Sequence, residues 1–138
     1  MPVKYPEAVL LDALNADATL SSLGVVAIKP LLADADTAPP FITWRRVNTE
    51  REHTFSGPTG AVKTTYAFTS YATTYIGSRQ VADAVRQVLD GLGGTVDNTT
   101  VSHVRVSNES DGLVQLAGSE LPPVYAIEQT VETLWQEI

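Results

Sequence analysis

The pattern of apolar and polar residues along the chain predicts β-strands in four segments. In each segment apolar side chains recur at every second position, which places them on one face of an extended chain. The segments are Phe41 to Asn48, Val62 to Ala72, Val101 to Ser107 and Val124 to Gln136. A short apolar run from Val25 to Ile28 is a further candidate strand, and Leu31 to Pro40 is predicted to be a loop.

Apolar residues at helical spacing predict two principal helices. The first spans Tyr5 to Asn15 and carries Pro6, which suits the first turn of a helix. The second spans Ile76 to Leu92 and is followed by glycines, which commonly end helices. Between these helices, Asp17 can cap a short helical turn from Ala18 to Leu23.

The order of these elements predicts the fold class. Neighbouring strands arrive in pairs and do not alternate strictly with helices, a pattern typical of α+β proteins. We therefore expect a mainly antiparallel sheet with two principal helices packed on one face. A length of 138 residues fits a single domain, residues 1–138, with one hydrophobic core.

Two polar stretches interrupt the strands. The segment from Thr49 to Gly60 is predicted to be a loop that ends in a turn at Gly57-Pro58-Thr59-Gly60. The segment from Ser107 to Pro123 is predicted to be irregular. His103 is expected to share a strand face with Val101, two positions before it.

Charge is unevenly distributed along the chain, which has a net charge of −7. Four basic residues fall close together in the middle: Arg45, Arg46, Arg51 and Lys63. No lysine or arginine follows Arg105, although six acidic residues do. This distribution fits either an acidic solvated surface or two complementary faces of an assembling subunit. It argues against a protein that binds nucleic acid through a basic surface.

The residues that most often carry chemistry form no recognisable site. There is no cysteine, and the two histidines, His53 and His103, lack the further ligands that a metal site needs. The glycine-rich stretch at residues 91–94 closes a helix, whereas a phosphate-binding loop would open one. We therefore expect no enzyme activity and no catalytic, cofactor-binding or metal-binding residues. No membrane span or signal peptide is expected either, which favours the cytoplasm.

Several segments together resemble the tail completion family of long-tailed bacteriophages, which includes tail-to-head joining proteins. The resemblance rests on Pro40 to Val47, on Glu50 to Thr54 and on Gly57-Pro58-Thr59-Gly60. It continues through Tyr66 to Ala72 and through the helix that contains Ala82-Asp83-Ala84-Val85-Arg86. A related prophage or gene-transfer-agent particle would contain a similar chain.

The resemblance implies a virion protein, assembled in the host bacterial cytoplasm, that caps the head-proximal end of the tail tube. Such proteins form a ring, usually of six subunits, that stops tube polymerisation and contacts the head connector or stopper protein. No sequence-specific binding of nucleic acid is expected, although such a ring could let genome DNA pass through it. The expected subunit or tail interface comprises Arg45, Arg46, Arg51, Glu52, His53, Gly57, Pro58, Gly60 and Lys63. The alternative is a small soluble α+β regulatory or ligand-binding module.

Overall fold

The computed structural model describes residues 5–25, 28–30, 40–96, 98–114 and 124–137. Three helices and six strands lie in these ranges. Their bounds, in chain order, are α1 Pro6–Asn15, α2 Ala18–Ser22, β1 Ile28–Pro30, β2 Phe41–Thr54, β3 Gly57–Ala72, α3 Tyr75–Leu89, β4 Gly94–Val96, β5 Thr99–Val114 and β6 Val124–Gln136.

The six strands form one sheet in the order β1-β2-β3-β6-β5-β4. Neighbouring strands are antiparallel except for β1 and β2, which run parallel. The last strand, β6, lies between β3 and β5, so the C-terminal part of the chain completes the centre of the sheet. The predicted α+β class with a mainly antiparallel sheet is confirmed.

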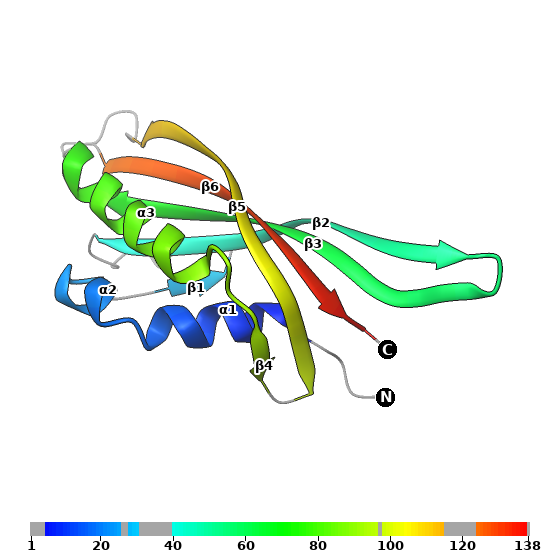
Figure 1. Cartoon of the computed structure of the whole chain (residues 1–138). Helices are drawn as coiled ribbons and strands as arrows, with labels where there is room; N and C mark the ends of the chain where they lie inside the picture. Colours follow the sequence, from blue (N-terminus) through cyan, green and yellow to red (C-terminus); the bar gives the residue numbers. More distant parts are fainter. Residues whose placement is uncertain (1–4, 26–27, 31–39, 97, 115–123, 138) are drawn as a thin grey trace.

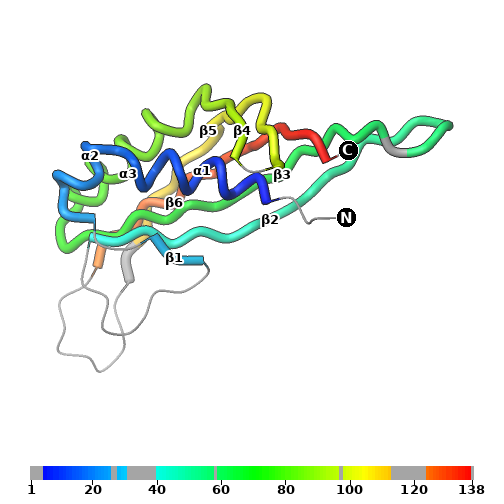
Figure 2. The backbone as a smooth tube through the Cα atoms, turned by 90° about the horizontal axis from the view of Figure 1, so that it is seen from below, coloured from blue at the N-terminus to red at the C-terminus, as the bar shows by residue number. Residues whose placement is uncertain are grey.

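All three helices lie along the same side of the curved sheet, as Figures 1 and 2 show. Beneath them is a core that contains Tyr66 and Phe68 of β3, which are both fully buried. Leu10 of α1 and Val85 of α3 reach the same core from the helices. Trp135 of β6 is also buried, and its Nε1 donates a hydrogen bond of 2.9 Å to Thr64 Oγ1.

The helix boundaries follow from local capping. The side chain of Thr74 accepts a hydrogen bond from the backbone N–H of Gly77 and begins α3, and Asp17 caps α2 in the same way, as predicted. Helix α3 ends at Leu89, three residues before the predicted end. Gly91 follows with a φ of +82°, a conformation that glycine adopts more readily than other residues.

The four main strand predictions were correct in position; β6 has the predicted bounds, and β2, β3 and β5 are longer than predicted. The predicted loop at residues 49–60 was wrong, because β2 continues to Thr54 and β3 begins at Gly57. The predicted turn at residues 57–60 therefore lies within β3, and the chain turns at Phe55 and Ser56. Strand β5 likewise continues to Val114, whereas residues 115–123 lie outside the described ranges.

Smaller corrections concern β1 and the face of His103. The predicted strand at residues 25–28 is found at residues 28–30, and the predicted loop at residues 31–39 lies outside the described ranges. A register shift between Val101 and His103 turns these residues to opposite sides of the sheet. Val101 is buried under the helices, and His103 is exposed on the other side.

Candidate assembly surface

The hairpin formed by β2 and β3 extends beyond the rest of the sheet. The two strands pair from Phe41 with Tyr71 as far as Thr54 with Gly57, whereas β3 and β6 pair only up to Ala61 with Gln136. Residues 52–60 therefore leave the sheet as a two-stranded projection, which we call the arm. Figures 1 and 2 both show the arm reaching away from the body of the protein.

Local hydrogen bonds shape the tip of the arm. Thr54 Oγ1 accepts a hydrogen bond from the backbone N–H of Ser56 and donates one to the carbonyl of Gly57. Gly57 has a φ of +120°, which favours glycine at this position. Further back, Thr59 Oγ1 donates to the carbonyl of Glu52 across the two strands. These bonds hold together a ribbon that would be marginal in isolation.

The base of the arm is tied to the C-terminal end of β6. The backbone N–H of Glu137 donates a 2.7 Å hydrogen bond to the carbonyl of Gly60. The guanidinium of Arg51 makes two hydrogen bonds, of 2.8 and 2.9 Å, to the carboxylate of Glu137. This hydrogen-bonded ion pair raises the pKa of Arg51 above its ordinary value. A planar two-point contact of this kind fixes direction as well as distance, so the arm leaves the sheet in a defined direction.

Phe55 at the tip of the arm is fully exposed, and the residues on either side of it are exposed and polar. Aromatic side chains are among the commonest anchors of protein–protein interfaces. An aromatic ring held at the end of a projecting hairpin is therefore a candidate anchor for a partner protein. Phe55 was not among the residues predicted from the sequence, although it is the one aromatic residue within a long polar stretch.

The structure separates the residues that the sequence grouped as an interface. Glu52, His53, Gly57, Pro58 and Gly60 all belong to the arm. The four basic residues do not form a cluster, because the strand register distributes them between the two sides of the sheet. The positions of Arg46 and Arg51 are on the helix-covered side, opposite Tyr66 and Val62, and those of Arg45 and Lys63 are on the helix-free side.

Two of these basic residues already have acidic partners within the same chain. Besides the pair of Arg51 with Glu137, Lys63 lies 3.3 Å from Glu132, which Arg105 also approaches at 3.5 Å. The acidic C-terminal part of the chain therefore neutralises basic residues of its own subunit. In the simplest version of the complementary-face interpretation, both groups of charges find their partners only on a neighbouring subunit. Arg51 and Lys63 do not fit that version, because each has an acidic partner in its own chain.

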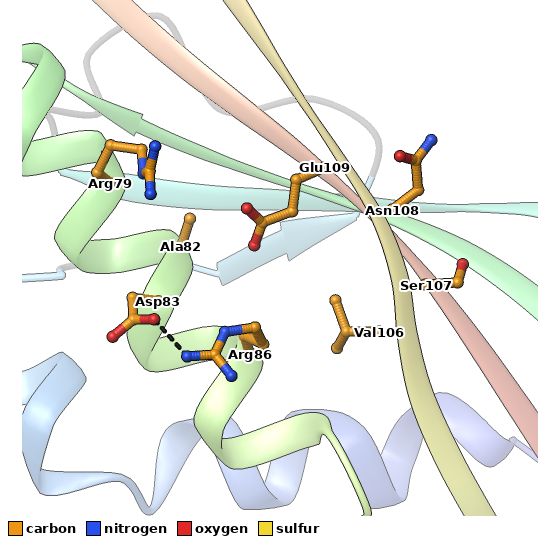
Figure 3. Close-up of a pocket in the computed structure, with 8 residues that line it drawn as sticks. All are labelled: Arg79, Ala82, Asp83, Arg86, Val106, Ser107, Asn108 and Glu109. Atoms are coloured by element: carbon orange, nitrogen blue, oxygen red, sulfur yellow. Dashed lines mark hydrogen bonds and ion pairs between the residues drawn. The ribbon is translucent and has the colours of Figure 1, made fainter.

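A shallow polar groove runs between α3 and β5 (Figure 3). Arg79, Asp83 and Arg86 line it from the helix, and Glu109 lines it from the strand. Asp83 and Arg86 form an ion pair of 2.6 Å, which raises the pKa of Arg86. Acidic and basic groups are thus balanced here, and the groove has no excess charge that would select an ion.

The described ranges contain no group of three or more histidine, cysteine, aspartate or glutamate side chains that could hold a metal ion. No helix within these ranges is long and apolar enough to span a bilayer.

Comparisons with known proteins support the resemblance found in the sequence. A family model described as "Tail completion protein gp17" matches residues 8–117. A search of curated proteins found no match. A solved chain from the "Virion of native gene transfer agent (GTA) particle" has a TM-score of 0.77 and 14% sequence identity, over 94% of this chain and 93% of that chain. At this identity the structural match indicates a shared fold. The family match covers most of the sequence, so the chain belongs to the tail completion protein gp17 family of structural phage-tail proteins.

Proposed function

We propose that this protein caps the head-proximal end of the phage tail tube as a ring and stops polymerisation of the tube. The ring then offers its free surface to the head connector or stopper protein. Membership of the tail completion family carries this proposal. Six copies are the expected number, and the completed ring is part of the virion tail after assembly in the bacterial cytoplasm.

The arm supplies the structural support for this role. A capping subunit must contact both its neighbours in the ring and a second, different protein. A projecting hairpin with a fixed base can reach beyond its own subunit, and the exposed ring of Phe55 can fill a pocket on the surface that it meets. We propose that the arm, with Glu52, His53, Gly57, Pro58 and Gly60, docks onto an adjacent protein of the tail.

Polymerisation of purified tail tube protein tests the proposal. Tubes grown in the presence of this protein should stop growing and carry a ring at one end in negative-stain images. Phe55→Ser should fold normally and terminate tubes poorly. Ile76→Ser is the matched control, because Ile76 is a large exposed apolar residue on α3, away from the arm. Tubes of unchanged length without end rings would contradict the capping role. Normal termination by Phe55→Ser would contradict the role of the arm.

A further inference from the structure

Strands β2 and β5 form the two long outer edges of the sheet, and each is covered at one end only. The short strand β1 pairs with residues 42–44 of β2, and β4 pairs with residues 99–101 of β5. Within the described part of the chain, no strand pairs with the outer side of β2 from Arg45 to Thr54 or of β5 from His103 to Val114. Unpaired edges present a row of backbone donors and acceptors that can bind another strand.

The loop that follows α3 makes hydrogen bonds to part of the outer edge of β5, so only the rest of that edge is open. The backbone N–H of Gly91 donates to the carbonyl of Val104, and the N–H of Val106 donates to the Asp90 carboxylate. The open part of this edge therefore begins after Val106. Beyond the bulge there, β5 pairs regularly with β6 from residue 108 to residue 114. On the other edge, residues 48–51 of β2 form a similarly regular stretch. Neither strand contains proline, so each of its residues has a backbone N–H.

We infer that the open edge of β2 in one subunit pairs with the open edge of β5 in the next subunit, joining their sheets. This inference rests on the proposed ring, because it requires a second copy of the chain as the partner. It identifies two different patches that meet, as a closed ring of identical subunits requires.

Strand direction supports this pairing. The four long strands β2, β3, β6 and β5 alternate in direction, so the two outer strands run antiparallel to one another. A neighbour generated by rotation about an axis roughly along the strands keeps every strand direction. Its β2 then runs antiparallel to β5 of the first subunit, and the alternation continues across the boundary. The open stretches of β2 and β5 lie at different positions along the strand direction. Neighbouring subunits must therefore be shifted relative to one another along the strands, as tilted strands in closed sheets are.

Side-chain charge fits the same arrangement. In a joined sheet the helix-covered sides of both subunits lie on the same side. Arg46 is on that side of β2, and Glu109 and Asp111 are on that side of β5. All three residues are exposed, and Arg46 makes no ion pair within the described ranges. Opposite charges that face one another across neighbouring strands stabilise the pairing.

Engineered cysteines provide the test, since the natural sequence has none. Asn48→Cys lies on the helix-free side of β2, and Asn108→Cys and Ser110→Cys lie on the same side of β5. Rings are assembled on tail tubes from a mixture of two single-cysteine proteins and then mildly oxidised. A disulfide is expected between residue 48 and residue 108 or 110, because only residues within about 4.5 Å at Cβ can be joined without distortion. The matched control is Thr49→Cys in place of Asn48→Cys, because Thr49 is on the opposite side of β2.

The outcomes separate this inference from the proposed function. Rings that form without a disulfide from residue 48 to residue 108 or 110 would overturn the edge pairing and leave the capping role standing. A disulfide from residue 48 to residue 48 would also overturn it, because it indicates a two-fold dimer. Equal cross-linking of the Thr49→Cys control to residue 108 or 110 would mean random collision and would count against the pairing. If no ring forms on the tube with the wild-type chain, both proposals fail together.

Discussion

Replacing Tyr66 with phenylalanine should remove a specific link between helix α1 and the sheet. The ring of Tyr66 is fully buried, and its hydroxyl donates a 2.7 Å hydrogen bond to the carboxylate of Glu7. Phenylalanine fills the same space, so the substitution deletes a hydrogen bond without opening a large cavity. Hydrogen bonds to charged groups contribute about 1.5–3 kcal/mol, and Glu7 is only half-buried and can recover some hydration. We therefore expect a loss near the lower limit, about 1.5 kcal/mol at pH 7.

The same contact predicts how this loss depends on pH. Burial raises the pKa of the Tyr66 hydroxyl far above its ordinary value, and the hydrogen bond and the charge of Glu7 raise it further. The folded state therefore keeps this proton at pH values where the unfolded chain, with a tyrosine pKa of roughly 10, releases it. The contribution of the Tyr66 hydroxyl to the free energy of unfolding is complete below pH 10 and declines by about 1.4 kcal/mol per pH unit above it. The gap between wild type and Tyr66→Phe should therefore close near pH 11.

Urea denaturation followed by tryptophan fluorescence measures both effects, because Trp135 is buried in the same core. Stabilities of wild type and variant are compared at each pH from 7 to 11, so that other titrating groups cancel in the difference. Tyr71→Phe is the control, because Tyr71 is half-buried on the helix-free side and stacks on Phe41. A gap between wild type and Tyr66→Phe that stays constant across this range would refute the reasoning.

Three further substitutions have defined outcomes. Thr64→Val removes the acceptor of the buried Trp135 N–H and should cost about 1–3 kcal/mol in urea denaturation, more than Thr65→Val on the other side of β3. Thr74→Ala removes the cap of α3 and should cost about 1 kcal/mol by the same measurement, whereas Thr73→Ala should cost less. Arg46→Glu should weaken ring formation at low salt. The difference from wild type should shrink above about 0.1 M salt, where the screening length falls to roughly 10 Å. If sedimentation or native mass measurements show a difference that does not depend on salt, a charge effect is excluded.

The sequence predicted the strands that bury a face and missed those that do not. Apolar and polar residues alternate in Val62 to Ala72 and in Val124 to Gln136, because one side of each strand packs against helices. The prediction that one face of the last strand carries Tyr125, Ile127, Val131 and Trp135 is confirmed. In the arm, both sides of a two-stranded ribbon are exposed. Because neither side has to be apolar, the sequence shows no alternation of apolar and polar residues there. The polar second half of β5 has the same cause.

The candidate site was predicted in part for a related reason. Family resemblance selected residues that all lie on the β2–β3 hairpin, but sequence proximity is a poor guide to spatial proximity in strands. Arg45 and Arg46 are adjacent and occupy opposite sides of β2, as the pleat requires. Bulges after Arg46 and after Arg51 then shift the alternation of side chains between the two sides of the sheet. The side on which a later residue lies therefore cannot be predicted from odd and even positions alone. The partner of Arg51 lies 86 residues away, and no local pattern reveals it.

The pairing of charges within the subunit bears on what could hold a ring together. Each chain has a net charge of −7, so repulsion between neighbours opposes assembly, and the contacts of Arg51 and Lys63 with Glu137 and Glu132 are already made in the free subunit. Forming a ring therefore cannot gain those contacts a second time. Within the described ranges, the uncharged groups that remain available are the backbone of two open strand edges and the ring of Phe55. Screening by salt affects these contacts little. Arg46, which makes no ion pair in the described part of the chain, and its acidic counterparts on β5 should therefore act mainly in selecting the edges that meet.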